Sequence, residues 1–513
     1  MKNRSKDGWI QRYWYRACAG LIIVIAFFLR FYNYTSRFAF AGDQARDALV
    51  AREALRHLTL PLLGPFSSAG NFTTGFIWYT WLTLSTAIFP KSILTPWIVL
   101  SLTYVGIVAV MMVIGHKLFG KTFSLIVGLY TAVAPAQIIQ SLNITNPSLV
   151  AVFSALALLF VVNYLDNGGY GSMFLLASSI SLAISAHFQA LYLVILVPFV
   201  LVVRKADFKA YVIALVGLLW PFIPYVLVDS RIGYYNLRGI VDYALYGQNK
   251  IYVPNRWLTY AFKFVPDLWS QIIGGTTIIG FIIILLTGIT ILVTATRRII
   301  TKSFFVISTC TLFIMIMLRY YKGERYFGYF VFLHPFILIL TAWVSYECLK
   351  LNKLLGILLI AIIVGGSMYV NYGNIVNAVN YTYDQTRYWT NVLTKKYPDK
   401  KFDVYSVGNQ PNFKGISLVL YLDSADKIDD KGYKIGFGGT PKGEARHYTL
   451  LKENTNTYDI WDLNSSPSAK LRKVGWRNIN PSYIYQSTTA WYTKIHNGKG
   501  FKQVIDLILS KFK

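Results

Sequence analysis

Residues 17–47, ACAGLIIVIAFFLRFYNYTSRFAFAGDQARD, decide the fold class, because a long apolar run leads into a charged segment. The run 21–29 contains no charged residue, and a helix that crosses a bilayer core of roughly 30 Å needs about 17–25 mostly apolar residues. Residues 1–16 are basic, and no small-residue cleavage site follows the run. We therefore expect a retained first membrane span rather than a signal peptide.

The apolar character extends along much of the chain. Of its 513 residues, 55% are hydrophobic, and the mean hydropathy is +0.44. We expect about eleven transmembrane helices, at 17–33, 92–115, 123–140, 147–164, 171–187, 190–204, 208–228, 276–296, 303–318, 327–348 and 354–371. The twelfth candidate, 75–89, has only about fifteen residues and several hydroxyl side chains, which suits an interfacial helix better than a span.

The charges of the short loops predict the orientation. With eleven spans and a cytoplasmic N-terminus, Lys and Arg fall in cytoplasmic loops: two in 116–121, three in 204–209, three in 297–302 and two in 350–353. The opposite turns, 141–146 and 187–189, carry none. Because positive loops favour the cytoplasm, we expect a multi-pass cell-membrane protein whose C-terminus lies outside the cytoplasm.

These predictions define two domains. Residues 1–371 form an all-α polytopic membrane domain, with interfacial helices in a first outer loop at about 33–91. Residues 372–513 are more polar and contain short alternating stretches at 402–407, 416–422 and 433–437, which predict strands. We therefore expect a soluble, extracytoplasmic α/β domain at the C-terminus.

The net charge of +27 does not indicate a nucleic-acid partner, because the basic residues lie largely between apolar runs. Two interpretations remain open: these charges orient the chain and contact anionic lipid, or those in outer loops hold a phosphate-bearing substrate. The three cysteines, Cys18, Cys310 and Cys348, have no metal-ligand spacing. No metal ligands are assigned.

The charged segment after the first span carries two carboxylates and an arginine. Gly42 and Asp43 predict a helix start with Asp43 as its cap. Asp43 and Asp47 are four residues apart and share one helix face, and Arg46 lies beside them. One interpretation is a surface helix that Asp43 merely caps; the other is a catalytic carboxylate beside a phosphate-neutralising arginine.

Further candidates lie in the other outer segments. Trp78 and Tyr79 suit either the aromatic belt at the headgroup level or a platform for a sugar ring. His187 is either a packed, hydrogen-bonded residue or a site residue. The segment 319–329 concentrates Arg, Lys and Tyr side chains outside, against the positive-inside trend. Two interpretations remain open: phosphate binding, and charges that snorkel at an interface. Its binding candidates are Tyr321, Lys322, Arg325 and Tyr326.

Asp43 and Arg46, directly after an apolar span, resemble the motif of the C-type glycosyltransferase superfamily. Its members include the protein O-mannosyltransferases and the aminoarabinose lipid A transferases. Their motif is Asp-Glu, often followed by Arg two residues on, and its Asp is the catalytic or substrate-positioning carboxylate. In this sequence Gln44 replaces the Glu.

Four later segments also resemble this superfamily, over about residues 17–345. The stretch 64–79 is similar to its second juxtamembrane helix, and 116–121 resembles its basic turn after the second span. Asn146-Pro147 stands where many members have Asp-Pro. Arg325-Tyr326 resembles an Arg-Tyr or His-Tyr pair close to the lipid phosphate. The resemblance implies binding roles for Asn146, Arg325 and Tyr326.

We therefore expect a membrane glycosyltransferase of the cell envelope that moves a hexose or pentose from a polyprenyl-phosphate donor to an acceptor outside the membrane. Asp43 acts as base or positions the acceptor, and Asp47 is its partner or an alternative base. Arg46 and Arg325 hold phosphate, with the donor bound between the first outer loop and 319–325. The sequence identifies neither the sugar nor whether the acceptor is protein, lipid or glycan. It requires no cofactor, and a divalent metal stays an open alternative. A transporter or flippase for a lipid-linked or anionic substrate is the alternative, although no internal repeat is found.

Overall fold

The structure is a computed structural model of the whole chain. It describes residues 7–38, 40, 42–67, 70–246, 256–296, 300–321, 325–376, 382–406, 415–429, 431–438, 449–452, 459–462 and 472–473. The chain forms two compact units. The membrane unit comprises Met1–Tyr32, Leu62–Trp78 and Leu100–Asn377, and the second unit comprises Asn33–Pro61, Tyr79–Val99 and Ala378–Lys513. Segments of the predicted outer loop 33–91 therefore group with C-terminal residues.

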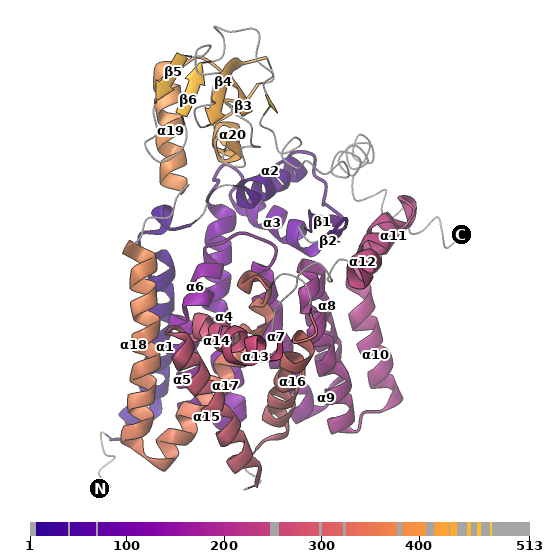
Figure 1. Ribbon diagram of the computed structural model, residues 1–513, viewed down its shortest axis with the longest axis vertical. Coiled ribbons are helices and arrows are strands. Elements are labelled where there is room, and N and C mark those ends of the chain that lie inside the picture. Colours follow the sequence, from indigo (N-terminus) through magenta and orange to yellow (C-terminus); the bar gives the residue numbers. More distant parts are fainter. Residues whose placement is uncertain are drawn as a thin grey trace, which may run out of the picture. The chain divides into compact units, whose positions relative to one another are not determined.

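Helices dominate the membrane unit (Figure 1). In chain order they are α1 (Asp7–Phe31), α4 (Thr95–Phe119, which begins in the second unit), α5 (Lys121–Val133), α6 (Pro135–Ser141), α7 (Ser148–Asn167), α8 (Tyr170–Ala186), η2 (Phe188–Ile195), α9 (Leu196–Arg204), α10 (Phe208–Leu219), η3 (Trp220–Phe222), α11 (Ile223–Arg231), α12 (Tyr235–Leu245), α13 (Arg256–Thr259), η5 (Tyr260–Phe264), α14 (Val265–Ile273), α15 (Thr277–Thr296), α16 (Lys302–Leu318), η6 (Phe327–Tyr329), η7 (Val331–Leu333), α17 (His334–Leu351) and α18 (Lys353–Val376).

Several of these helices are long and apolar enough to cross a membrane. Seven meet that requirement alone: Tyr13–Phe31, Thr95–Phe119, Ser148–Asn167, Phe208–Arg231, Thr277–Thr296, Val331–Leu351 and Lys353–Val376. The pair α5 and α6, bent by 56°, makes an eighth if it is one span. Three shorter apolar helices occur at Tyr170–Ala186, Phe188–Arg204 and Lys302–Leu318. A multi-pass membrane protein is therefore confirmed, and each predicted span coincides with an apolar helix, while the number eleven stays a prediction.

The bend between α5 and α6 follows from Pro135, which lacks a backbone N–H and disfavours helical geometry in the residue before it. Ala134 accordingly has an extended ψ of 117°. Carbonyls freed at such a break need other donors inside a membrane. The Arg30 Nη1 donates to the Ala132 carbonyl at 3.1 Å, and the Asn371 Nδ2 donates to the Val133 carbonyl at 2.8 Å. Side chains of α1 and α18 thus complete this bend.

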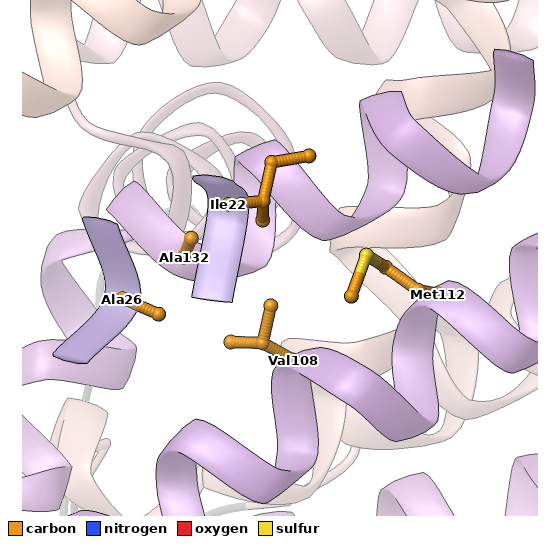
Figure 2. Close-up of a cluster of buried hydrophobic side chains, with 5 residues drawn as sticks. All are labelled: Ile22, Ala26, Val108, Met112 and Ala132. Carbon is orange, nitrogen blue, oxygen red and sulfur yellow. The ribbon is translucent and has the colours of Figure 1, made fainter. Parts of the chain in front are cut away.

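The core of the membrane unit is closely packed around α17. Every residue from 331 to 345 is buried. Side chains of α1, α4 and α5 form another buried cluster, in which Ile22, Ala26, Val108, Met112 and Ala132 interlock (Figure 2). Farther along the chain, α8 packs between α7 and α10 (Figure 1).

A small hairpin of β1 (Leu63–Phe66) and β2 (Thr73–Gly75) lies in the same unit. It is hydrogen-bonded to α11 and α12: the Asn236 Oδ1 accepts from the Thr73 backbone N–H at 2.8 Å, and the Tyr225 hydroxyl donates to the Thr73 carbonyl at 3.0 Å. Buried Asp229 accepts in turn from the backbone N–H of Asn236 at 2.7 Å. These bonds fix where α3 (Ile77–Ile88) begins. This helix spans about 18 Å, too short to cross a bilayer.

The second unit contains η1 (Tyr34–Ser36), α2 (Asp43–Arg56), most of α3, α19 (Tyr383–Lys396), α20 (Gly415–Ser424) and a five-stranded sheet. The strands are β3 (Phe402–Ser406), β4 (Tyr433–Gly438), β5 (Thr449–Lys452), β6 (Asp459–Asp462) and β7 (Arg472–Lys473), in the order β5-β6-β4-β3-β7. β3 pairs with β4 in parallel, and the other pairs are antiparallel. That residues 372–513 form one soluble α/β domain stays a prediction, since many of them lie outside the described residues.

One predicted strand is wrong. The segment 416–422 belongs to α20, and all its side chains except Tyr421 are buried. A short apolar run that is buried on nearly every side has the same sequence pattern in a helix as in a strand. The predicted strands at 402–407 and 433–437 coincide with β3 and β4.

Candidate functional site

The helix α2 begins at Asp43, and its N-cap is Gly42 rather than the predicted Asp43. Gly42 has a φ of 57°, a conformation that glycine adopts without the strain of a Cβ. Asp43 therefore stands in the first helical turn, where the helix dipole favours a negative charge.

Arg46 holds both aspartates of α2. Its Nη1 lies 2.7 Å from the Asp43 Oδ1, and its Nη2 lies 2.7 Å from the Asp47 Oδ1. Its Nε also donates to the Asp47 Oδ1 at 2.9 Å. The Tyr79 hydroxyl donates to the same Asp47 oxygen at 3.0 Å. The helical spacing predicted that Asp43 and Asp47 share a face, and both contact one guanidinium.

The two carboxylates differ sharply in exposure: the Asp43 side chain is 62% exposed and the Asp47 side chain 1%. Asp43 can therefore meet a substrate, whereas Asp47 can act only through Arg46 and Tyr79. Trp78 is fully buried and Tyr79 is 5% exposed, so neither presents an open ring face to a sugar.

The opposite end of α2 is fixed by a residue that the sequence did not single out. Asp423, in α20, accepts from the Arg52 Nε at 2.9 Å and from the Arg56 Nη2 at 2.7 Å. Arg52 and Asp423 are both nearly buried, and the Arg52 Nη1 also donates to the Pro90 carbonyl at 2.9 Å. Asp423 thereby links the helix that carries Asp43 to the C-terminal part of the chain.

Three arginines gather in the membrane unit, from segments far apart in the sequence. The Arg256 Nη2 donates to the Tyr321 carbonyl at 2.9 Å, and the Arg325 Nη2 lies 3.4 Å from the carbonyls of Arg319 and Tyr321. The Arg319 guanidinium stacks over Trp257 at 4.2 Å. The Arg325 guanidinium lies over Tyr260 at 4.9 Å. We call Arg256, Arg319 and Arg325 the arginine cluster.

The arginine cluster has an excess of positive charge. Among the described residues, no carboxylate lies within ion-pairing distance of any of the three. The buried Nε atoms of Arg256 and Arg319 have no hydrogen-bond acceptor in the described part of the chain. Burial, followed by repulsion from Arg256 and Arg319, lowers the pKa of Arg325. Such a cluster has the donors and the charge to bind an anion such as phosphate.

Other predicted residues lie around Tyr321. This tyrosine is 7% exposed, and its hydroxyl is hydrogen-bonded to the Tyr243 hydroxyl at 2.8 Å and to the Gln189 Nε2 at 3.4 Å. The His187 ring stacks on Tyr329 with centroids 5.0 Å apart.

Two more predicted residues lie near these rings. The Asn146 Nδ2 donates to the Ala186 carbonyl at 2.8 Å and so supports the turn that carries His187. Tyr326 is 59% exposed and meets Tyr329 edge-on, with centroids 5.2 Å apart. Lys322 lies outside the described residues.

The predicted site residues therefore fall into two groups, described separately. Asp43, Arg46, Asp47 and Tyr79 belong to the second unit. Asn146, His187, Tyr321, Arg325 and Tyr326 belong to the membrane unit, as does Trp78. Within the described ranges no three His, Cys, Asp or Glu side chains come together as a metal site would require.

The sequence did not identify Arg256, Gln189 or Tyr243 as binding residues. The basic residue Arg256 stood among five Lys and Arg of the segment 229–275, and only the fold brings it to Tyr321.

The described helices define a polytopic membrane protein in which the arginine cluster concentrates positive charge. Its fold is similar to that of ArnT from Cupriavidus metallidurans: the apo crystal structure has a TM-score of 0.58 at 11% identity, covering 89% of this chain and 99% of that one. The crystal structure of the same protein bound to undecaprenyl phosphate gives 0.57 at 13% identity, covering 91% and 100%.

A solved structure of a second protein has a lower score. The Archaeoglobus fulgidus oligosaccharyltransferase tethered to an acceptor peptide matches with a TM-score of 0.50 at 11% identity, over 82% of this chain and 64% of that one. No protein-family model and no curated protein matches the sequence. The likeness to ArnT confirms the fold that the predicted resemblance implied, and at these identities it shows the fold alone.

Proposed function

We propose that the protein is a membrane glycosyltransferase that transfers a sugar from a polyprenyl-phosphate donor to an acceptor at the outer face of the membrane. The observation that carries this function is the arginine cluster: three cations without a described carboxylate partner, two of them with buried Nε donors that lack acceptors. The similar fold of ArnT, which has been crystallised with undecaprenyl phosphate, supports a lipid phosphate as the anion.

We assign different parts of the reaction to Asp43 and to the arginine cluster. An acceptor hydroxyl attacks the anomeric carbon, the bond from that carbon to the phosphate oxygen breaks, and polyprenyl phosphate leaves. Asp43 receives the acceptor proton, since its carboxylate is exposed. Arg256, Arg319 and Arg325 stabilise the negative charge that develops on the departing phosphate. Because the leaving group is already an acid of low pKa, no general acid is needed.

The role of Arg46 follows from its partners. Arg46 pairs with two carboxylates of α2, so we assign it the role of orienting Asp43, and phosphate binding by Arg46 stays a prediction. Asp47 is buried and keeps Arg46 in place through its ion pair, so we assign it a positioning role and not that of a second base. The sugar, a hexose or a pentose, and the acceptor, whether protein, lipid or glycan, are left open. We also propose that transfer takes place outside the cytoplasm, with the N-terminus inside.

Binding of undecaprenyl phosphate to the purified protein in nanodiscs tests the arginine cluster. Arg325→Gln removes one charge-assisted donor and should weaken binding roughly tenfold to a hundredfold. Arg238→Gln is the matched control, because Arg238 is exposed on α12. Equal binding by Arg325→Gln and the wild type would contradict the proposed site.

Turnover distinguishes the enzyme from a flippase. A transferase releases polyprenyl phosphate from a radiolabelled donor such as undecaprenyl phosphate mannose when an acceptor extract is added. A flippase moves the intact donor across a vesicle membrane and leaves the sugar–phosphate bond unbroken. Translocation without bond cleavage would therefore replace the proposed function.

A further inference from the structure

A set of neutral polar side chains adjoins the arginine cluster through a single residue, Tyr321. The backbone carbonyl of Tyr321 accepts from Arg256 at 2.9 Å. Its side-chain hydroxyl is bonded to Tyr243 at 2.8 Å and to the Gln189 Nε2 at 3.4 Å. A phosphate on the arginines would thus be next to this second set. The group that a donor carries on its phosphate is the sugar.

Two buried atoms of this set lack hydrogen-bond partners within the described part of the chain: the Gln189 Oε1 and the His187 Nδ1. Gln189 uses its amide N–H group on Tyr321, which leaves its carbonyl oxygen as an acceptor. Native proteins rarely leave buried polar atoms unpaired, because the lost hydration is not recovered. These atoms are therefore suited to a hydroxylated ligand.

The set has no net charge. His187 lies between α8 and η2, and among the described residues no carboxylate lies within ion-pairing distance of its ring. Burial, followed by neighbouring tyrosines, raises the pKa of Tyr243, and no carboxylate contributes to that shift. The side chains of Gln189 and His187 lie close to each other, and the other groups found in contact with them are tyrosines.

Aromatic rings complete the set. Tyr329 stacks on His187, and the exposed Tyr326 meets Tyr329 edge-on. The C–H face of a sugar ring packs well on such surfaces. Hydroxyl groups, which both donate and accept, match the Gln189 carbonyl, the imidazole and the tyrosine hydroxyls. An ammonium group, in contrast, would lie beside three arginines, with no carboxylate among the described residues to pair with it.

We propose that Gln189, His187 and Tyr321 recognise the hydroxyl groups of an uncharged sugar on the lipid phosphate, so that the protein selects neutral over amino-sugar donors. This inference rests on the proposed function, because the arginine cluster must hold the phosphate of the same donor.

Equilibrium binding to the full-length protein in nanodiscs tests this selectivity. The probes are undecaprenyl phosphodiesters of equal charge at the phosphate: a methyl ester without sugar, the glucosyl, galactosyl and mannosyl esters, and the 4-amino-4-deoxyarabinosyl ester. At least one neutral hexose should bind about fivefold or more tighter than the methyl ester, as expected when one or two hydrogen bonds are gained. The aminoarabinosyl ester should show no such gain.

Single substitutions test whether Gln189 causes the tighter binding of the hexose ester. Gln189→Leu should abolish the advantage of the hexose and leave binding of the methyl ester within twofold of the wild type. Gln271→Leu, on the exposed side of α14, is the matched control and should keep the advantage. Gln189→Glu offers a counterion and should confer tighter binding of the aminoarabinosyl ester.

These measurements distinguish a wrong sugar assignment from a wrong lipid-phosphate site. If no hexose gains over the methyl ester, or if Gln189→Leu keeps the gain, the sugar assignment is overturned even though Arg325→Gln still weakens every probe. If Arg325→Gln weakens none of the probes, the lipid-phosphate site and hence the proposed function fail instead.

Discussion

At the scale of single residues, Arg46 gives the two aspartates of α2 different roles. It contacts both, yet only Asp43 is exposed, while Asp47 is enclosed by Arg46 and Tyr79. This difference in exposure is why we propose that Asp43 takes part in the reaction and that Asp47 positions Arg46.

Substitution should separate these roles. Asp43→Asn should reduce turnover about a hundredfold or more, since general bases contribute that much, without changing the melting temperature. Asp47→Asn should destabilise the protein by about 1–3 kcal/mol, because Arg46 and Tyr79 lose a charged acceptor. Turnover and thermal unfolding in detergent measure both effects. Full activity of a folded Asp43→Asn variant would remove Asp43 from the mechanism.

Gly75 shows how closely the hairpin packs on α8. A Cβ at this position would lie 2.2 Å from the Ser185 Oγ and 2.9 Å from the Ser185 Cβ. Gly75→Ala should cost about 1–3 kcal/mol of stability. The double variant Gly75→Ala/Ser185→Gly should recover most of it, because it removes the clashing atoms. A double-mutant cycle with no coupling would show that the hairpin lies elsewhere.

At the scale of elements, α20 supports α2. Asp423 uses both carboxylate oxygens, one on Arg52 and one on Arg56. Asp423→Asn should therefore lower kcat about fivefold to tenfold by loosening the helix that carries Asp43, while binding of undecaprenyl phosphate stays unchanged. Asp423→Glu should restore part of kcat.

Asp426→Asn is the control for that experiment. Asp426 is 93% exposed, and among the described residues it forms an ion pair only with Lys401, at 3.2 Å, so little is lost with its charge. It also has a φ of 55°, which asparagine tolerates well. Equal losses of kcat in the two variants would argue against a specific role for Asp423.

The elements also show what the sequence could predict. Asp43, Arg46 and Asp47 were recognised because they lie within one helical turn, where spacing determines proximity. The arginine cluster could be predicted only in part: 319–325 is dense in charge, but Arg256 joins it across about sixty residues of chain. No sequence pattern marks Gln189 as a binding residue, because only its contact with Tyr321 in the fold singles it out. Helix and strand were confused at 416–422 because burial on nearly every side removes the periodicity.

At the scale of the whole molecule, the charges of the short loops and the proposed function predict the same orientation in the membrane. If the loops 116–121, 204–209, 297–302 and 350–353 face the cytoplasm, the transferred sugar is taken up and delivered outside. Asp43 and Arg325 would then share the outer compartment, whichever way the two units are arranged.

Cysteine labelling on intact cells tests this topology directly. The three native cysteines, Cys18, Cys310 and Cys348, are first replaced by alanine. A membrane-impermeant maleimide should then label Arg238→Cys and Lys400→Cys, both at exposed positions, without permeabilisation. Lys205→Cys and Lys353→Cys, exposed in the basic loops, should be labelled only after the cells are opened. The reverse pattern would place the arginine cluster in the cytoplasm. Labelling of Lys205 and Lys400 from the same side would mean that the chain crosses the membrane an even number of times between them, contrary to the five spans predicted there.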